Sequence, residues 1–313
     1  MKFGLGMPAL ITYPPVMSRW EPEATGADIL RIARHADELG FDWLTVPEHI
    51  IIPNEMLEIM GPRFPEALTA AAVLAGATHH VSMLTYILVL PYRNPIFLAK
   101  QIATLDWLSG GRITLGTASG HMEREFDLLD INFHERGKRA DEYLLAMKEL
   151  WTKDHPSFSG KYVNFDEVTF EPKPVQKPHP PILIGGNSKA AMRRAANIGD
   201  GWLPWLVRRP QLAQELEYIK EQPGYNARSA RGLAPFEVIM PLAPLNVEDY
   251  THKELGRTIA PKTKDAIIEE LGLLAEAGAT GTLVGPPKTP GPDRFIEWMD
   301  WFAEEIMPVT RGS

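Results

Sequence analysis

The chain has 313 residues with 44% apolar and 23% charged side chains, and its 32 basic and 40 acidic groups give a formal net charge of −8. This composition is typical of globular proteins, and an acidic balance without any basic run argues against nucleic-acid binding. With no cysteine, disulfides, thiolate nucleophiles and cysteine-ligated zinc are excluded. The longest apolar stretches, Ala67–Ala77 and Met83–Pro91, are too short to span a bilayer, and no signal-peptide pattern opens the sequence. We therefore expect a cytoplasmic protein with no membrane partner.

Strand-like and helix-like hydrophobic periods alternate along the chain. The run Lys2–Met7 predicts a strand, and apolar residues at helical spacing predict a helix over Glu23–Leu39 that ends at Gly40. The other predicted strands are Phe41–Val46, Val81–Leu90, Arg112–Ala118, Pro181–Gly185, Asp200–Leu203, Phe236–Leu242 and Gly281–Gly285. The other predicted helices are Glu66–Ala77, Pro95–Leu108, Arg136–Trp151, Lys189–Ile198, Gln211–Glu221, Thr263–Ala277 and Asp293–Ile306.

Eight strand–helix units over this length favour a (β/α)8 TIM barrel, an α/β fold, over an open doubly wound sheet. Continuous apolar strands between amphipathic helices indicate parallel strands that are covered on both faces. We therefore expect one barrel domain over residues 1–313.

Three segments are insertions in this barrel: Ile50–Pro65 after strand 2, Pro241–Lys262 after strand 7 and Lys153–Pro180 before strand 5. The first two follow strands, so they belong to the C-terminal face, where barrel enzymes build their active sites. In the third, Lys161–Phe165 and Glu167–Glu171 are expected to pair as a hairpin.

Several common catalytic motifs are absent from the sequence. Gly4-Leu5-Gly6 does not continue to a third glycine, and neither a phosphate-binding Gly-Lys-Ser/Thr loop nor a Gly-x-Ser-x-Gly elbow occurs. The nine histidines form neither a His-x-His nor a His-Glu-x-x-His pair, so we predict no metal site.

The end of strand 2, Val46-Pro47-Glu48-His49, presents a histidine where a barrel places catalytic groups. His49 is a candidate for proton transfer near neutral pH, although a histidine that only bonds within its loop would fit the same position. Glu48 either orients His49 or faces solvent.

The end of strand 4, Gly116-Thr117-Ala118-Ser119-Gly120-His121, combines small residues with polar ones. Small residues let a flat ring approach the backbone, and Thr117, Ser119, Gly120 and His121 are candidate ligand contacts. A tight strand-to-helix turn without a ligand is the alternative.

Strands 5 and 6 end in two further candidate segments. The turn Gly185, Gly186, Asn187 and Ser188 opens a helix, whose free N–H groups and dipole suit a phosphate, although an Asn or Ser cap without ligand is the simpler reading. Trp202, at the end of strand 6, either walls a planar ligand or packs inside the protein.

Motifs in order along the chain resemble the luciferase-like monooxygenase superfamily. The similarity runs from about Phe3 to Trp205. It is carried by Leu90-Pro91-Tyr92-Arg93-Asn94-Pro95, Ala99-Lys100-Gln101-Ile102-Ala103-Thr104-Leu105-Asp106, Ser109-Gly110-Gly111-Arg112, Phe158-Ser159-Gly160-Lys161-Tyr162, Pro172-Lys173-Pro174-Val175-Gln176, Pro181-Ile182-Leu183-Ile184-Gly185-Gly186 and Asp200-Gly201-Trp202.

This resemblance implies a TIM barrel with an isoalloxazine-type ring across its C-terminal mouth. It implies a non-prolyl cis peptide at Tyr86–Ile87 that supports the ring, and a phosphate-binding turn at Gly185–Ser188. His49 matches a position that faces the reactive ring edge in deazaflavin enzymes. His121 stands where relatives place a tryptophan or an acid.

Two reactions follow from the two cofactors of the superfamily. With the deazaflavin coenzyme F420, a hydride moves between the cofactor and a small organic substrate while His49 or His121 handles a proton. With reduced FMN and O2, the substrate is oxygenated and the protein must exclude water. The sequence favours the first reading; a non-catalytic flavin-binding relative is a third. The resemblance also implies a homodimer, and Ile50–Pro65 and Pro241–Lys262 are expected to shape the substrate pocket.

Overall fold

The computed structural model describes residues 1–205, 207–241, 263–285 and 288–311. The predicted insertion Pro241–Lys262 and the last residue of the predicted strand Phe236–Leu242 therefore lie outside the described residues, apart from Pro241.

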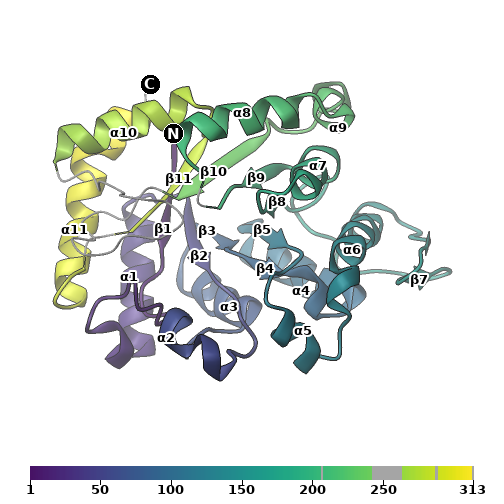
Figure 1. Ribbon diagram of the computed structural model, residues 1–313, viewed down its shortest axis with the longest axis horizontal. Helices are drawn as coiled ribbons and strands as arrows, with labels where there is room; N and C mark the ends of the chain where they lie inside the picture. Colours follow the sequence, from purple (N-terminus) through teal and green to yellow (C-terminus); the bar gives the residue numbers. More distant parts are fainter. Residues whose placement is uncertain (206, 242–262, 286–287, 312–313) are drawn as a thin grey trace.

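Parallel strands form a closed barrel at the centre of the molecule (Figure 1). Neighbouring strands pair in chain order, and the ring closes because the first strand also pairs with the last. The barrel strands are β1 (Lys2–Gly6), β2 (Trp43–Val46), β3 (Ser82–Thr85) with its continuation β4 (Leu88–Val89), β5 (Ile113–Ala118), β8 (Ile182–Gly185), β9 (Gly201–Leu203), β10 (Glu237–Pro241) and β11 (Gly281–Val284). The predicted (β/α)8 barrel is confirmed.

Helices surround the strands on the outside (Figure 1). These are α1 (Gly26–Glu38), α3 (Ala67–Ala77), α4 (Pro95–Ser109), α6 (Arg136–Thr152), α7 (Lys189–Asn197), α8 (Arg209–Lys220), α10 (Lys264–Glu276) and α11 (Pro292–Glu305). Shorter helices α2 (Leu57–Met60), α5 (Glu123–Leu128), α9 (Pro223–Asn226) and α12 (Met307–Arg311) lie in the connections or at the end. No helix in the described ranges is both long enough and apolar enough to cross a membrane.

Local sequence signals set the helix ends. Thr25 and Asp28 form a reciprocal capping box at the start of α1, and Asn94 caps α4 through the N–H groups of Ile96 and Phe97. Gly110 ends α4 in the left-handed region with φ of 71°, where a residue without Cβ is favoured.

The apolar core has two parts. One lies between the strands and the helices, and the other fills the barrel interior. We call the second part the lumen cluster; it consists of Trp43, Leu84, Leu183, Leu203, Ile239 and Leu283. Gly116 makes room for it, because a Cβ at this position would lie 2.1 Å from the Thr85 carbonyl oxygen and 2.9 Å from Leu203.

The predicted hairpin before strand 5 is wrong in its pairing. The two-residue strands β6 (Phe158–Ser159) and β7 (Asn164–Phe165) pair with each other, and Glu167–Glu171 contains no strand. The Glu142 carboxylate accepts hydrogen bonds from the backbone of residues 161–163, which bends this segment into the turn between β6 and β7. Glu167 has φ of 53°, which is incompatible with a regular strand.

Candidate active site

The C-terminal ends of β2, β4, β5 and β8 meet at one mouth of the barrel. Leu88 pairs with Thr117, and Thr117 pairs in turn with Ile184, so the ends of the third, fourth and fifth barrel strands lie side by side. The ends of β2 and β4 are joined by the Glu48 carboxylate, which accepts the Val89 N–H at 2.9 Å. Most of the side chains singled out in the sequence lie at these strand ends.

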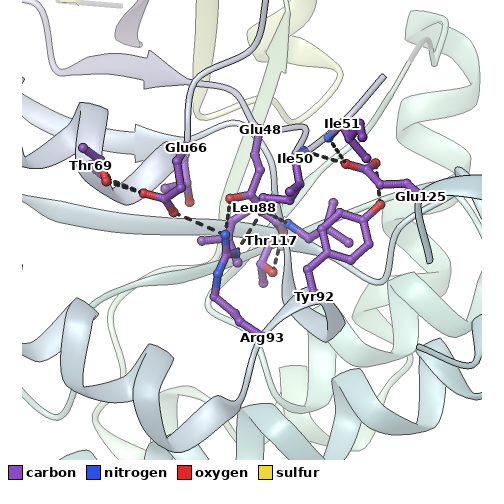
Figure 2. Close-up of polar contacts among 12 residues, drawn as sticks. Glu48, Ile50, Ile51, Glu66, Thr69, Leu88, Tyr92, Arg93, Thr117 and Glu125 are labelled. Atoms are coloured by element: carbon purple, nitrogen blue, oxygen red, sulfur yellow. Dashed lines mark hydrogen bonds and ion pairs between the residues drawn. The ribbon is translucent and has the colours of Figure 1, made fainter. Parts of the chain in front are cut away.

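His49 is held by Glu125, a buried residue of the short helix α5. His49 Nδ1 lies 2.9 Å from Glu125 Oε2, and the side chain of Glu125 has no exposed surface. The same oxygen accepts the Tyr92 hydroxyl at 2.6 Å, while Oε1 accepts the backbone N–H groups of Ile50 and Ile51 at 2.6 and 3.2 Å (Figure 2). One carboxylate therefore organises the histidine and the loop that follows it.

These contacts decide the charge of Glu125. Burial alone would raise its pKa, but the hydrogen bonds from His49 and Tyr92 outweigh that effect and hold the pKa below its ordinary value. The pKa of Tyr92 is raised by burial and by its bond to Glu125. At neutral pH Glu125 is an anion and Tyr92 a neutral donor.

Glu48 belongs to a second ionic cluster and does not contact His49. Arg93 binds the two Glu48 oxygens at 3.0 and 2.6 Å and reaches Glu66 at 3.3 Å (Figure 2). Successive residues of an extended segment point in opposite directions, which separates Glu48 from the His49 ring. Neither predicted alternative for Glu48 holds in this structure: Glu125 is bonded to His49, and Glu48 is buried, where it links β4 to β2 instead of facing solvent.

His121 lies beside His49 with a perpendicular ring, at 5.9 Å between ring centroids. Partial burial, followed by the proximity of His49, lowers the pKa of His121. On another side of His49, the Phe64 ring packs edge-on at 4.7 Å. The insertion after β2 therefore supplies an apolar wall to the histidine pair.

Of the other candidates at the end of β5, Thr117 and Gly120 have structural roles and Ser119 is partly exposed. Thr117 is buried, and its hydroxyl donates to the Leu88 carbonyl at 2.8 Å, so it fastens two strands together. Gly120 has φ of 88°, and a Cβ there would lie 2.7 Å from Phe126. Ser119 is partly exposed at the mouth.

The turn after β8 is held by a hydrogen bond from β9. Trp202 is fully buried, and its indole N–H donates to the Gly186 carbonyl at 2.8 Å, so in this structure it supports the turn and presents no wall to solvent.

The start of α7 is capped by Ser188, whose side chain accepts the Ala191 N–H at 3.1 Å. The Asn187 side chain accepts the Trp205 N–H at 2.9 Å and donates to the Trp205 carbonyl. Residues 187–190 are exposed.

The third barrel strand is interrupted between β3 and β4 by a non-proline cis peptide at Tyr86–Ile87, as the resemblance implied. Ile87 reaches β8, since a Cβ at Gly185 would lie 2.4 Å from Ile87 Cδ1. Tyr86 packs against the lumen cluster, and burial raises the pKa of its hydroxyl. Its oxygen is buried and has no hydrogen-bond partner among the described residues.

Sequence reasoning missed Glu125, Tyr92, Arg93 and Phe64 as members of the site. Tyr92 and Arg93 belong to the Leu90–Pro95 motif, which indicated the family but not the contacts that these two side chains make. Glu125 carries no local signal, because α5 has only six residues and lies in a connection that showed no helical period. Among the described residues, no group of three or more histidine, aspartate or glutamate side chains could hold a metal ion.

Three features lie at one mouth of the barrel: the His49–His121 pair, the exposed turn before α7 and the interrupted third strand. This arrangement is typical of a ligand-binding enzyme. Residues 2–249 match the family described as "Luciferase-like monooxygenase". The chain belongs to this family, whose members are flavin- or deazaflavin-dependent oxidoreductases and monooxygenases.

Two relatives illustrate the sequence similarity. The FMNH2-dependent dimethylsulfone monooxygenase of Pseudomonas putida is 38% identical over 138 residues, which are 43% of this chain and 38% of that protein. An uncharacterised protein of Mycobacterium tuberculosis is 28% identical over 295 residues, covering 88% of this chain and 93% of that one.

Solved structures share the whole fold. The monooxygenase RslO1 from Streptomyces bottropensis is similar with a TM-score of 0.77 and 25% identity, over 98% of this chain and 99% of that one. An F420-dependent secondary alcohol dehydrogenase has a TM-score of 0.76 at 21% identity over 99% of both chains, a likeness in fold.

Proposed function

We propose that the protein is an oxidoreductase that transfers a hydride between coenzyme F420 and a small organic substrate, with His49 exchanging the proton. The observation that carries the proposal is the His49–Glu125 pair at the end of β2, because a histidine backed by a buried carboxylate is equipped for general acid–base work. Hydride transfer to or from a C–O centre needs such a group, since a proton must reach or leave the oxygen.

Three observations support the fit of an F420 or FMN cofactor. The turn Gly185–Ser188 leads into α7, and the exposed residues 187–190 there offer backbone amides that suit a phosphate. Because Gly185 has no Cβ, the Ile87 side chain can lie over it, and this surface of the interrupted third strand can face a flat ring. The buried Tyr86 hydroxyl has no partner among the described residues and is available to a ligand. When bound, a deazaflavin supplies or accepts the hydride.

The protein's own groups then have defined tasks. Nδ1 of His49 faces Glu125, which leaves Nε2 to take a proton from an alcohol oxygen or to return one to a carbonyl oxygen. His121, with its lowered pKa, stays neutral beside His49 and offers a hydrogen bond to the substrate. Phe64 packs against the His49 ring and excludes water from that side.

Cofactor titration tests the proposal. Quenching of tryptophan fluorescence is measured with F420, with FMN and with the phosphate-free forms of both, riboflavin and deazariboflavin. We expect F420 to bind most tightly and its phosphate-free form at least about tenfold more weakly. Absence of binding by all four compounds would refute the cofactor assignment.

The role of His49 is tested separately. In His49→Ala, turnover should fall by about 10²-fold or more, while the dissociation constant of the cofactor stays within about threefold of the wild-type value. Unchanged turnover would remove His49 from the chemistry. Loss of turnover in proportion to loss of cofactor binding would make it a binding residue.

A second candidate is an FMN-dependent monooxygenase that uses reduced flavin and O2. It is favoured by the 38% identity to a relative named as FMNH2-dependent. Substrate-dependent O2 consumption with reduced FMN would identify this activity, whereas turnover with F420 without O2 uptake supports the first proposal. Cofactor binding without turnover in either assay would indicate a non-catalytic flavin-binding relative.

A further inference from the structure

The Glu125 carboxylate has both of its oxygens filled by named donors. Oε2 receives the Tyr92 hydroxyl, and Oε1 receives the N–H groups of Ile50 and Ile51 (Figure 2). Oε2 also lies 2.9 Å from His49 Nδ1. An ionised carboxylate can only accept hydrogen bonds. Each of its neighbours must therefore present a hydrogen to it, and His49 can do so only with Nδ1 protonated.

We propose that Glu125, supported by Tyr92, is the positioning residue of the site, which selects the His49 tautomer with hydrogen on Nδ1 and leaves Nε2 as the atom that exchanges the proton. Only the transfer of the proton between Nε2 and a substrate rests on the proposed function. The tautomer itself is a property of the protein without any ligand.

Among the described residues, the other charged groups near His49 do not compete for this task. Arg93 is engaged by Glu48 and Glu66, the two carboxylates of the second ionic cluster. His121 meets His49 through perpendicular rings at 5.9 Å between centroids, and Tyr92 is a neutral donor to Glu125. Within the part of the chain that the structure describes, Glu125 is the carboxylate in hydrogen-bond contact with the His49 ring.

A glutamine at position 125 would reverse the polarity of this contact while preserving shape. The amide oxygen can still accept the Ile50 and Ile51 N–H groups, which directs the NH2 group toward His49 and Tyr92. An NH2 group donates, so Nδ1 must become the acceptor and the hydrogen must move to Nε2. Glu125→Gln should therefore invert the His49 tautomer.

The experiment is NMR of the full chain without ligand, labelled with ¹⁵N-histidine, in which two-bond ¹H–¹⁵N correlations identify the ring nitrogen that carries the hydrogen. The signals of His49 are assigned by their loss in His49→Gln. We expect Nδ1–H in the wild type, Nε2–H in Glu125→Gln and Nδ1–H in the control Glu123→Gln, whose side chain lies on the same helix and is exposed. Tyr92→Phe keeps the carboxylate and should retain Nδ1–H.

Nε2–H in the wild type, or an unchanged tautomer in folded Glu125→Gln, would overturn the proposal. If Glu125→Gln does not fold, the wild-type and Tyr92→Phe spectra decide it, and Nε2–H in either one overturns it. The outcome of the cofactor titration does not depend on the outcome of the NMR experiment. A protein that binds no cofactor but shows the expected tautomers would refute the proposed function and leave the role of Glu125 standing.

Discussion

The Tyr86 hydroxyl illustrates how one side chain can reveal a ligand site. Its oxygen is buried, no described residue is bonded to it, and its ring packs against the apolar lumen cluster. An unsatisfied buried hydroxyl destabilises a protein by about 1–3 kcal/mol, so such groups are rare unless a ligand or water completes them.

Replacing Tyr86 by phenylalanine removes this unsatisfied group while keeping the ring. We expect Tyr86→Phe to raise the free energy of unfolding of the ligand-free protein by about 1 kcal/mol, measured by urea denaturation. The control is Tyr143→Phe, whose hydroxyl accepts from Arg139 at 3.2 Å and whose loss should lower stability. A destabilised Tyr86→Phe would show that the hydroxyl already has a partner in the free protein.

At the residue scale, the sequence identified positions better than contacts. His49 and His121 were predicted at separate strand ends, and the structure brings their rings within 5.9 Å. The partner of His49 was not predictable, because Glu125 follows it by 76 positions and no local pattern links the two. Glu48 was the wrong partner because sequence adjacency does not imply side-chain contact in extended backbone.

At the scale of elements, strand and helix periods located the barrel units, and the errors fall where tertiary contacts override them. The run Val81–Leu90 looked like one strand, but the structure divides it into β3 and β4 around Tyr86–Ile87. The hairpin was misplaced because Glu142, on α6, binds the turn from outside the segment. Neither cause is visible in a local hydrophobic pattern.

His179, in the segment before β8, belongs to a buried charged cluster with Asp200 and with Arg228, which follows α9. Asp200 accepts from Arg228 at 3.0 Å and from the Ile182 N–H at 3.0 Å, and His179 lies 3.7 Å from Asp200. Burial, followed by the proximity of Lys148, lowers the pKa of His179 below its ordinary value.

This cluster makes stability depend on pH. Because the unfolded chain binds a proton at His179 more readily than the folded one, the stabilisation is present above the unfolded pKa of about 6.5 and is lost as the pH falls below it. We expect the melting temperature to fall between about pH 7.5 and 5.5, and to fall less in His179→Gln. The exposed His155 provides the control, since His155→Gln should follow the wild type. An equal fall in all three proteins would contradict this assignment.

At the scale of the whole molecule, one outer face carries several exposed apolar side chains. Phe97, Trp107 and Leu108 of α4 are 63%, 54% and 71% exposed, and Val73 of the adjacent α3 is 55% exposed. Large apolar side chains that gather on an exposed helix are typical of a surface that another surface covers. We expect a second copy of the chain to cover it, in the homodimer that the family resemblance implies.

The dimer is tested by charging this face. Wild-type protein should sediment as a dimer in analytical ultracentrifugation, and the double variant Phe97→Glu with Leu108→Glu as a monomer. Leu145→Glu changes an exposed leucine on α6 and should remain dimeric. A monomeric wild type, or a double variant that stays dimeric, would exclude α4 as the interface.

We propose that the barrel mouth binds the phosphate of a flavin-type cofactor at the start of α7, with His49 at the reacting end. A crystal structure of the protein soaked with F420 or FMN decides this proposal. We expect the cofactor phosphate within hydrogen-bonding distance of the amides at the Gly185–Ser188 turn and the start of α7, and the ring between Ile87 and the His49–His121 pair. A cofactor bound elsewhere, or an empty barrel mouth at saturating cofactor concentration, would refute the proposal.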